Sequence, residues 1–136
     1  MTDSVQKTPR QISIENGEQI IITIMAYLVL FEVFTLIVKI IIGQFITIVD
    51  AIRIILTIVS CVYLYKGRNW AKIFLTLGAM LGVFVGVRYV FLTIVNPVFS
   101  AFNLILFLVI AILNSVVAYY LIFSIDVDEF MKSRKA

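Results

Sequence analysis

The chain has 136 residues, of which 62% are hydrophobic and 14% are charged, and its formal net charge is +3. A soluble domain carries about 25% charged residues, and a chain this short has too little polar surface to hide so many apolar side chains from water. A soluble enzyme, a nucleic-acid-binding module and a disordered chain are thereby excluded, and an integral membrane protein is predicted. The chain has one cysteine, Cys61, and no histidine, so no disulfide, metal site or cofactor is expected.

The chain begins with a polar segment. Residues 1–19 include Asp3, Glu15 and Glu18 and are expected to form a flexible cytoplasmic tail. The apolar run that follows is too long for the hydrophobic region of a signal peptide and precedes no small-x-small cleavage site. It is therefore expected to remain in the mature protein.

Four apolar runs have the length of a transmembrane helix, which needs about 20 mostly apolar residues. They cover residues 20–42, 45–65, 70–95 and 99–124. Their connections are short: Gly43-Gln44, then Lys66 to Asn69, then Asn96-Pro97-Val98. Because short loops make sequence neighbours antiparallel neighbours in space, the predicted fold is all-α, a polytopic four-helix bundle with up-down topology.

The first two spans carry ionisable residues on helical stripes. Glu32, Thr35 and Lys39 share one face of the first span. The second span has an equivalent stripe, formed by Asp50, Arg53, Thr57 and Ser60. With a rise of about 1.5 Å per residue, Glu32 and Arg53 fall at similar depths near the middle of the bilayer and are expected to pair.

The other ionisable residues within the spans fall in the outer third of the bilayer. Asp50 is expected to form an ion pair with either Lys39 or Arg88, and Arg88 lies on the third span. An Arg, Lys or Asp in mid-span costs at least about 2.5 kcal/mol on insertion scales, so such groups face each other or water rather than lipid.

The most distinctive polar segment is the turn between the second and third spans, Lys66-Gly67-Arg68-Asn69-Trp70-Ala71-Lys72. Lys66, Arg68 and Lys72 are suited to anchoring the topology through anionic headgroups, beside the interfacial Trp70, or to docking a partner. This segment resembles the Gly-Arg-Asn-Trp-Ala-Arg/Lys turn of small, largely uncharacterised bacterial membrane proteins with four helices. The resemblance covers about seven residues and the span layout, and it implies architecture rather than activity.

The third span carries Gly78, Gly82 and Gly86, a repeat of small residues every four positions. Such a ridge lets another helix backbone approach closely. Two roles of this ridge are compatible with the sequence. It packs against a neighbouring helix of the same chain, or it forms a homo-oligomer interface. Arg88 lies well round the helix from the ridge.

The fourth span places Asn103 and Asn114 on one face, three turns apart. The segment that follows, residues 125–136, has acidic residues first and basic residues last, and it is expected to be a solvated helix end in the cytoplasm.

The distribution of basic residues predicts the orientation. The Gly43-Gln44 and Asn96-Pro97 loops contain no Lys or Arg, whereas both ends of the chain and the middle turn do. The positive-inside rule therefore places both termini and the middle turn in the cytoplasm. Together with the resemblance to small bacterial membrane proteins, which implies a bacterial source, this orientation gives the plasma (inner) membrane as the expected location.

Three interpretations of the intramembrane charges remain open. Glu32, Lys39, Asp50, Arg53 and Arg88 either pair and set the helix register, or line an outward-facing polar cavity for a substrate, ion or proton, or contact a membrane partner. Glu32 is the best candidate for proton exchange, because it is a lone carboxylate in the middle of a span.

The functional hypotheses follow from these features. The first is a non-enzymatic interaction protein of the inner membrane: an accessory subunit, a regulator, or an immunity protein against a membrane-active toxin. Its expected partners are the lipid bilayer and a second copy or another membrane protein, without nucleic acid. An intramembrane enzyme is disfavoured because no nucleophile–base pair or metal-ligand set is visible.

The alternative is a small oligomeric transporter or channel with a mid-membrane site around Glu32. The layout is similar to that of the small multidrug resistance family, whose members exchange protons for cationic drugs as dimers. The resemblance gives Glu32 the role of that family's membrane carboxylate. Arg53 and Arg88 depart from it, because these cations neutralise Glu32, repel cationic drugs and suit anionic substrates better.

Overall fold

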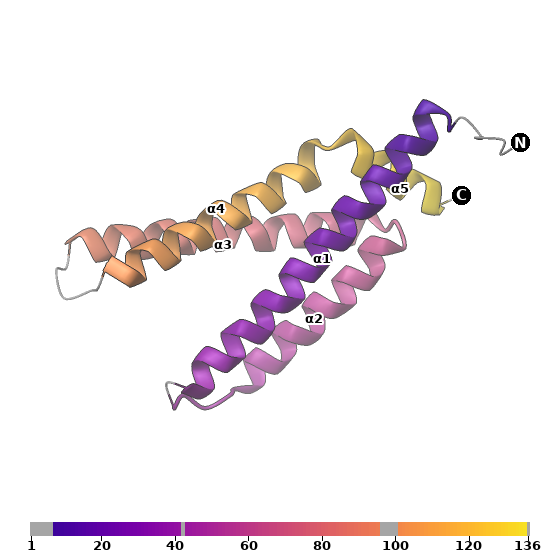
Figure 1. The fold of residues 1–136 in the computed structure, drawn as a ribbon. Helices are drawn as coiled ribbons and strands as arrows, with labels where there is room; N and C mark the ends of the chain where they lie inside the picture. The colour runs from indigo at the N-terminus through magenta and orange to yellow at the C-terminus, as the bar shows by residue number, and fades with distance from the viewer. Residues whose placement is uncertain (1–6, 42, 96–100, 136) are drawn as a thin grey trace, which may run out of the picture. The chain divides into compact units, whose positions relative to one another are not determined.

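The computed structural model describes residues 7–41, 43–95 and 101–135 of the chain. Within these ranges it is all helical and has no strand (Figure 1). The helices are α1 (Pro9–Ile41), α2 (Ile48–Tyr65), α3 (Asn69–Val95), α4 (Ala101–Phe123) and α5 (Ile125–Lys135). The first four are each long and apolar enough to cross a bilayer, which is consistent with a multi-pass membrane protein.

The helices fall into two compact units. Unit 1 contains residues 1–71 and 124–136, and unit 2 contains residues 72–123. Unit 1 therefore holds α1, α2 and α5, whereas unit 2 holds α4 and nearly all of α3. The expected turn at Asn96-Pro97-Val98 lies outside the described residues.

Helix α1 begins at Pro9 rather than near residue 20, so the expectation of a flexible tail is wrong for residues 9–19. The reason is a reciprocal cap. The backbone N–H of Gln11 donates to the Thr8 hydroxyl (3.4 Å), and the Thr8 N–H donates to the Gln11 side-chain oxygen (2.9 Å). This is the capping-box arrangement. Proline is favourable at the first helical position because an N–H there would have no partner within the helix, so its absence costs nothing.

A second capping box sets the start of α2. Thr47 is the N-cap, and its hydroxyl accepts from the Asp50 N–H while the Asp50 carboxylate accepts from the Thr47 N–H. The helix therefore starts at Ile48 and not at residue 45 as expected. Gly43 lies in the preceding turn with φ +75°, a conformation that glycine adopts without steric cost.

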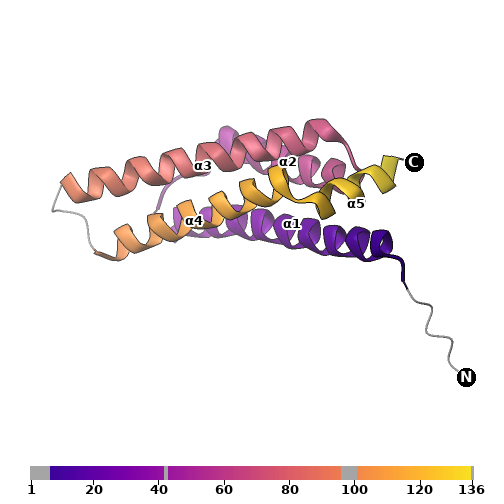
Figure 2. The same ribbon diagram turned by 90° about the horizontal axis from the view of Figure 1, so that it is seen from above.

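The C-terminal segment is a helix, as predicted, but only one face of it is exposed. Val127, Phe130 and Met131 of α5 are almost fully buried, and Figures 1 and 2 show α5 lying across the first part of α1. The crossing is close because Gly17 has no side chain: a Cβ there would lie 2.0 Å from the Asp126 carbonyl oxygen. The core at this end of unit 1 consists of Ile21, Ile24, Leu64, Val127, Phe130 and Met131.

Within unit 2, α3 and α4 form an antiparallel pair that approaches at the glycine ridge. A Cβ at Gly86 would lie 3.0 Å from that of Ala111, and one at Gly82 would lie 3.0 Å from the Asn114 side chain. By contrast, a Cβ at Gly78 meets nothing within 4 Å. Two of the three ridge positions therefore serve packing within the chain.

Candidate intramembrane polar site

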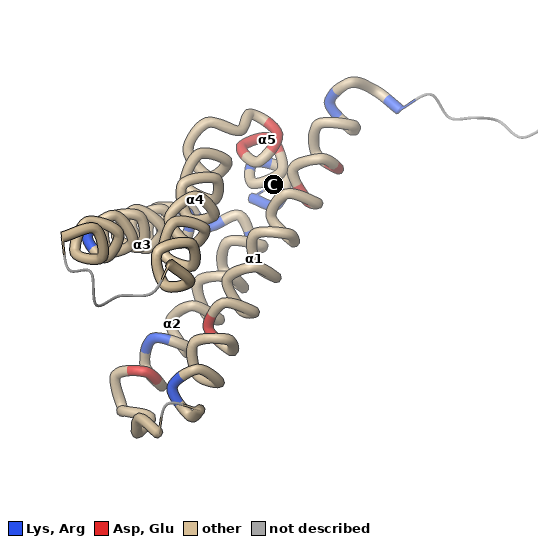
Figure 3. The backbone as a smooth tube through the Cα atoms, turned by 60° about the vertical axis from the view of Figure 1, so that its left-hand side comes forward, with Lys and Arg blue, Asp and Glu red and all other residues tan. Residues whose placement is uncertain are grey.

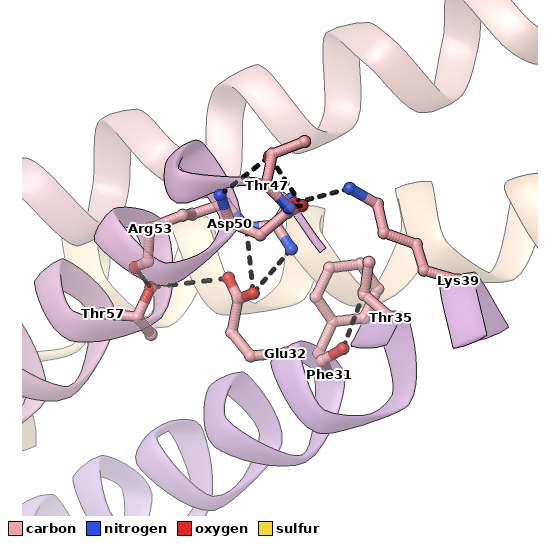
Figure 4. Close-up of polar contacts among 8 residues, drawn as sticks. All are labelled: Phe31, Glu32, Thr35, Lys39, Thr47, Asp50, Arg53 and Thr57. Carbon is pink, nitrogen blue, oxygen red and sulfur yellow. Dashed lines mark hydrogen bonds and ion pairs between the residues drawn. The ribbon is translucent and has the colours of Figure 1, made fainter. Parts of the chain in front are cut away.

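The charged positions of unit 1 gather toward the two ends of its helices (Figure 3). One ion pair joins Glu32 of α1 to Arg53 of α2. The Arg53 Nη2 lies 2.8 Å from the Glu32 Oε2, and its Nε donates to the same oxygen at 2.9 Å (Figure 4). The Glu32 side chain is 12% exposed and that of Arg53 is 44% exposed. The predicted pairing is confirmed, and the carboxylate is the better covered partner.

The second pair lies where α1 and α2 meet their connecting loop. The Lys39 ammonium donates to the Asp50 Oδ1 at 2.6 Å. The other oxygen, Oδ2, accepts from the Thr47 hydroxyl at 2.8 Å and from the Thr47 N–H at 3.0 Å. Of the two partners expected for Asp50, the structure therefore shows Lys39. The Asp50 side chain is only 5% exposed, and both of its carboxylate oxygens accept hydrogen bonds.

The remaining members of the two stripes have other roles. The Thr35 hydroxyl donates to the Phe31 carbonyl oxygen of its own helix, and the Thr57 hydroxyl donates to the Arg53 carbonyl oxygen. Thr57 also lies 3.5 Å from Glu32. These threonines satisfy their polar atoms locally, so the stripes act through their charged members.

Arg88 is separate from this group. It lies on α3, in unit 2, and its side chain is exposed. Residues 72–123 contain no Asp or Glu, so Arg88 has no carboxylate within its own unit.

A third polar cluster links α1, α2 and α5 at the end of unit 1 that lies opposite the loop of the α1–α2 hairpin. The sequence prediction missed this cluster. The Tyr65 hydroxyl donates to Glu18 at 2.6 Å. Arg134 of α5 donates to Glu18 at 3.2 Å and to the Tyr65 oxygen at 3.0 Å, and its guanidinium lies 4.7 Å from the Tyr65 ring centroid. The antiparallel register that pairs Glu32 with Arg53 also places Glu18 beside Tyr65, so part of this cluster was predictable.

Two further polar contacts, one hydrogen bond and one ion pair, hold α5 against α1. The Ser13 hydroxyl donates to Asp126, and Arg10 lies 3.5 Å from Glu129. Together with the buried face of α5, they make the two polar segments of the sequence into one packed region of unit 1.

The turn between α2 and α3 has the expected mixture of cations and aromatic rings. The Tyr63 and Trp70 ring centroids lie 5.2 Å apart, and the Lys66 ammonium lies 5.7 Å from the Tyr63 centroid. Lys66 and Arg68 are exposed, whereas Lys72, just inside unit 2, is half-buried. Trp70 is 48% exposed, and its position at the bilayer interface stays a prediction.

The arrangement has clear chemical consequences. A carboxyl that exchanges protons during transport must be able to lose its compensating cation, but Glu32 and Asp50 each have one in direct contact. Within the described residues, no group of three or more Cys, Asp or Glu side chains is placed to hold a metal ion. An open groove between α3 and α4 is apolar, and none of the five intramembrane charged residues lines it.

Comparison of the chain with protein-family models, with curated proteins and with solved structures finds no match.

Proposed function

We propose that this chain is a non-enzymatic bacterial inner-membrane protein that acts through helix–helix contacts, as an accessory, regulatory or immunity-type interaction protein. The observation that carries the proposal is the pairing of the intramembrane carboxylates. Glu32 contacts Arg53 and Asp50 contacts Lys39, so both acidic groups stabilise the α1–α2 hairpin and neither is a lone carboxyl available for proton exchange.

The architecture proposed for this function is an up-down bundle of the two hairpins with both termini in the cytoplasm. Support comes from the basic residues, which are absent from the loop at Gly43-Gln44 and abundant at the α2–α3 turn and on α5. In this arrangement the polar parts are small, so the surface available to a protein partner consists largely of helix faces within the bilayer.

Two kinds of contact suit such a surface. Gly78 is the ridge position that meets nothing within 4 Å, which favours close approach of another helix at this level. That helix belongs either to a second copy of the chain or to a different membrane protein.

The test is affinity purification in a mild detergent, followed by identification of stoichiometric partners. A tagged chain is expected to recover one membrane protein, or a second copy of itself, in constant ratio. The matched variant Gly78→Leu changes the one open ridge position and is expected to lose that partner while the monomer stays folded. Repeated recovery of the monomer alone contradicts the proposal.

A transporter of anions is the second candidate, and the exposure of its cations favours it. Arg53 is 44% exposed despite its ion pair, and Arg88 has no carboxylate in its own unit. Proteoliposomes distinguish this candidate: Glu32→Gln in a folded protein abolishes proton-coupled flux if Glu32 is the coupling site. Unchanged flux, or none in the original protein, removes the candidate.

A further inference from the structure

The α2–α3 turn is held at the membrane surface by the elements on either side of it. Helix α2 ends at Tyr65 and α3 begins at Asn69, and both are long and apolar enough to cross a bilayer. A short connection between two spans lies at the level of the lipid headgroups. Its side chains therefore meet lipid phosphates whichever way round the protein is inserted.

The turn presents aromatic rings on one side and cations around them. Tyr63 and Trp70 come from different helices and contact each other, with ring centroids 5.2 Å apart. Rings of this amphipathic kind prefer the headgroup level of a bilayer. Lys66 lies beside the pair, 5.7 Å from the Tyr63 centroid, and Arg68 is exposed in the same turn.

Helix α5 brings another cation to the same place. The Lys135 ammonium donates to the Asn69 side-chain oxygen at 3.0 Å. The approach depends on Gly67, which has φ +75° and where a Cβ would lie 2.6 Å from the Met131 carbonyl oxygen. Residues far apart in the sequence thus meet in one α2–α3 turn cluster, formed by Tyr63, Lys66, Arg68, Trp70 and Lys135.

Among the residues that the structure describes, Lys66, Arg68 and Lys135 are not part of an ion pair. Residues 63–72 contain no Asp or Glu. Among the described residues, the ion pairs of the neighbouring acidic groups involve other cations: Glu18 pairs with Arg134, and Glu129 pairs with Lys132 and Arg10. In the described part of the chain, three positive charges therefore lie at the headgroup level beside an aromatic pair, and no ion pair joins them to a carboxylate.

We propose that the α2–α3 turn cluster binds the headgroup of an anionic phospholipid, with Lys66, Arg68 and Lys135 around the phosphate and the Tyr63–Trp70 pair beside the upper part of the lipid. Each Lys or Arg near an anionic membrane surface contributes about a fivefold increase in affinity. Since Lys135 belongs to α5 and the other cations to the turn, the bound lipid also links the C-terminal helix to the α2–α3 connection.

The single tryptophan of the chain makes the site measurable, because Trp70 is the only source of tryptophan fluorescence. The full chain is reconstituted in phosphatidylcholine vesicles that contain equal mole fractions of either brominated phosphatidylglycerol or brominated phosphatidylcholine. Brominated phosphatidylglycerol is expected to quench Trp70 more strongly, which corresponds to a several-fold preference. In the triple variant Lys66→Gln, Arg68→Gln, Lys135→Gln the two lipids are expected to quench equally.

Two controls separate a site from general charge attraction. Lys132→Gln removes one positive charge from α5, but Lys132 is paired with Glu129, so this variant is expected to keep the preference. Lys66→Arg with Lys135→Arg preserves the charge and is also expected to keep it. Equal quenching in the original protein, or a preference that survives in the triple variant, overturns the proposal. Relief of the quenching by inorganic phosphate at constant ionic strength overturns it too, because it identifies a site for free anions.

Discussion

At the scale of single residues, the Glu32–Arg53 pair decides between a structural and a transport role for the intramembrane charges. Glu32→Gln leaves Arg53 without its counter-ion inside the bilayer, so we expect a loss of about 2 kcal/mol in the free energy of unfolding. Adding Arg53→Met to Glu32→Gln removes the orphaned charge and is expected to restore at least half of the loss. Reversible unfolding in mixed detergent micelles measures both values.

The matched control for the Glu32→Gln substitution is Lys7→Gln, which also breaks an ion pair. Lys7 pairs with Glu15 at 2.7 Å, but both side chains are more than half exposed, and such surface pairs contribute little. We expect no measurable change in unfolding from this variant. If Glu32→Gln also leaves the free energy of unfolding unchanged, the Glu32–Arg53 pair does not stabilise the α1–α2 hairpin and the structural interpretation fails.

Two tyrosines in unit 1 differ in whether their hydroxyls have hydrogen-bond partners. Removing the hydroxyl should therefore change the free energy of unfolding in opposite directions at the two positions. The Tyr27 hydroxyl is buried and has no hydrogen-bond partner among the described residues, whereas the Tyr65 hydroxyl contacts both Glu18 and Arg134. Because an unsatisfied buried hydroxyl is destabilising, Tyr27→Phe should stabilise the protein by about 1 kcal/mol. Tyr65→Phe should destabilise it by about 1 to 2 kcal/mol.

Thermal unfolding of the two phenylalanine variants in one detergent makes the comparison. Each variant removes a single oxygen from a tyrosine of the same unit, so one is the control for the other. Destabilisation by both would mean that Tyr27 has a polar partner after all.

At the scale of elements, the docking of α5 depends on Gly17. A Cβ at this position would lie 2.0 Å from the Asp126 carbonyl oxygen and 2.9 Å from the Phe130 Cβ, which the two backbones cannot accommodate without moving apart. Gly17→Ala should therefore release α5 from α1. Trypsin cleavage after Lys132, Arg134 and Lys135 should become at least tenfold faster, which is readily followed by mass spectrometry.

The neighbouring substitution Asn16→Ala is the control for α5 release. Asn16 is exposed on the same turn of α1, so a similar increase in helix propensity occurs without the clash. Unchanged cleavage in Gly17→Ala would show that α5 does not rest on this glycine.

The glycine ridge of α3 makes a graded prediction of the same kind. Gly86→Leu places a large side chain against Ala111, where even a Cβ has only 3.0 Å, and overpacking of this kind costs about 1 to 3 kcal/mol. Gly78→Leu enters open space and should leave the free energy of unfolding of the monomer within about 0.5 kcal/mol. The ratio of the two effects, measured by unfolding in micelles, tests the α3–α4 register directly, and equal effects would contradict it.

The sequence predicted the spans well and the polar segments poorly, for a physical reason. Long apolar runs determine where helices cross a bilayer, and the short Gly43-Gln44 connection implied the antiparallel register that brings Glu32 to Arg53. The docking of α5 depends instead on the close approach at Gly17, which appears in the sequence only as a glycine near a charged segment. The two capping boxes, at Thr8 and Thr47, were readable as Ser/Thr-x-x-Gln/Asp patterns and would have corrected both helix starts.

At the scale of the whole molecule, the contacts of α5 constrain the topology before any charge rule is applied. Helix α5 contacts the first part of α1 at Gly17 and the α2–α3 turn at Gly67, so we expect these segments on the same side of the bilayer. The Lys39–Asp50 pair and Gln44 are at the other end of the α1–α2 hairpin. The positive-inside rule then predicts that the first side faces the cytoplasm.

Cysteine labelling of intact cells tests both steps of this assignment. In a Cys61→Ser background, which has no other thiol, Gln44→Cys is expected to react with a membrane-impermeant maleimide from outside. Lys7→Cys, Arg68→Cys and Lys132→Cys are expected to react only after the cells are opened, because all three positions lie at the end of unit 1 where α5 docks. Reaction of Gln44→Cys only after opening, with the other three labelled from outside, would reverse the orientation but keep the fold. Labelling of Gln44→Cys and Lys132→Cys from the same side would contradict the placement of α5 itself, because the two positions could then not be at opposite ends of the α1–α2 hairpin.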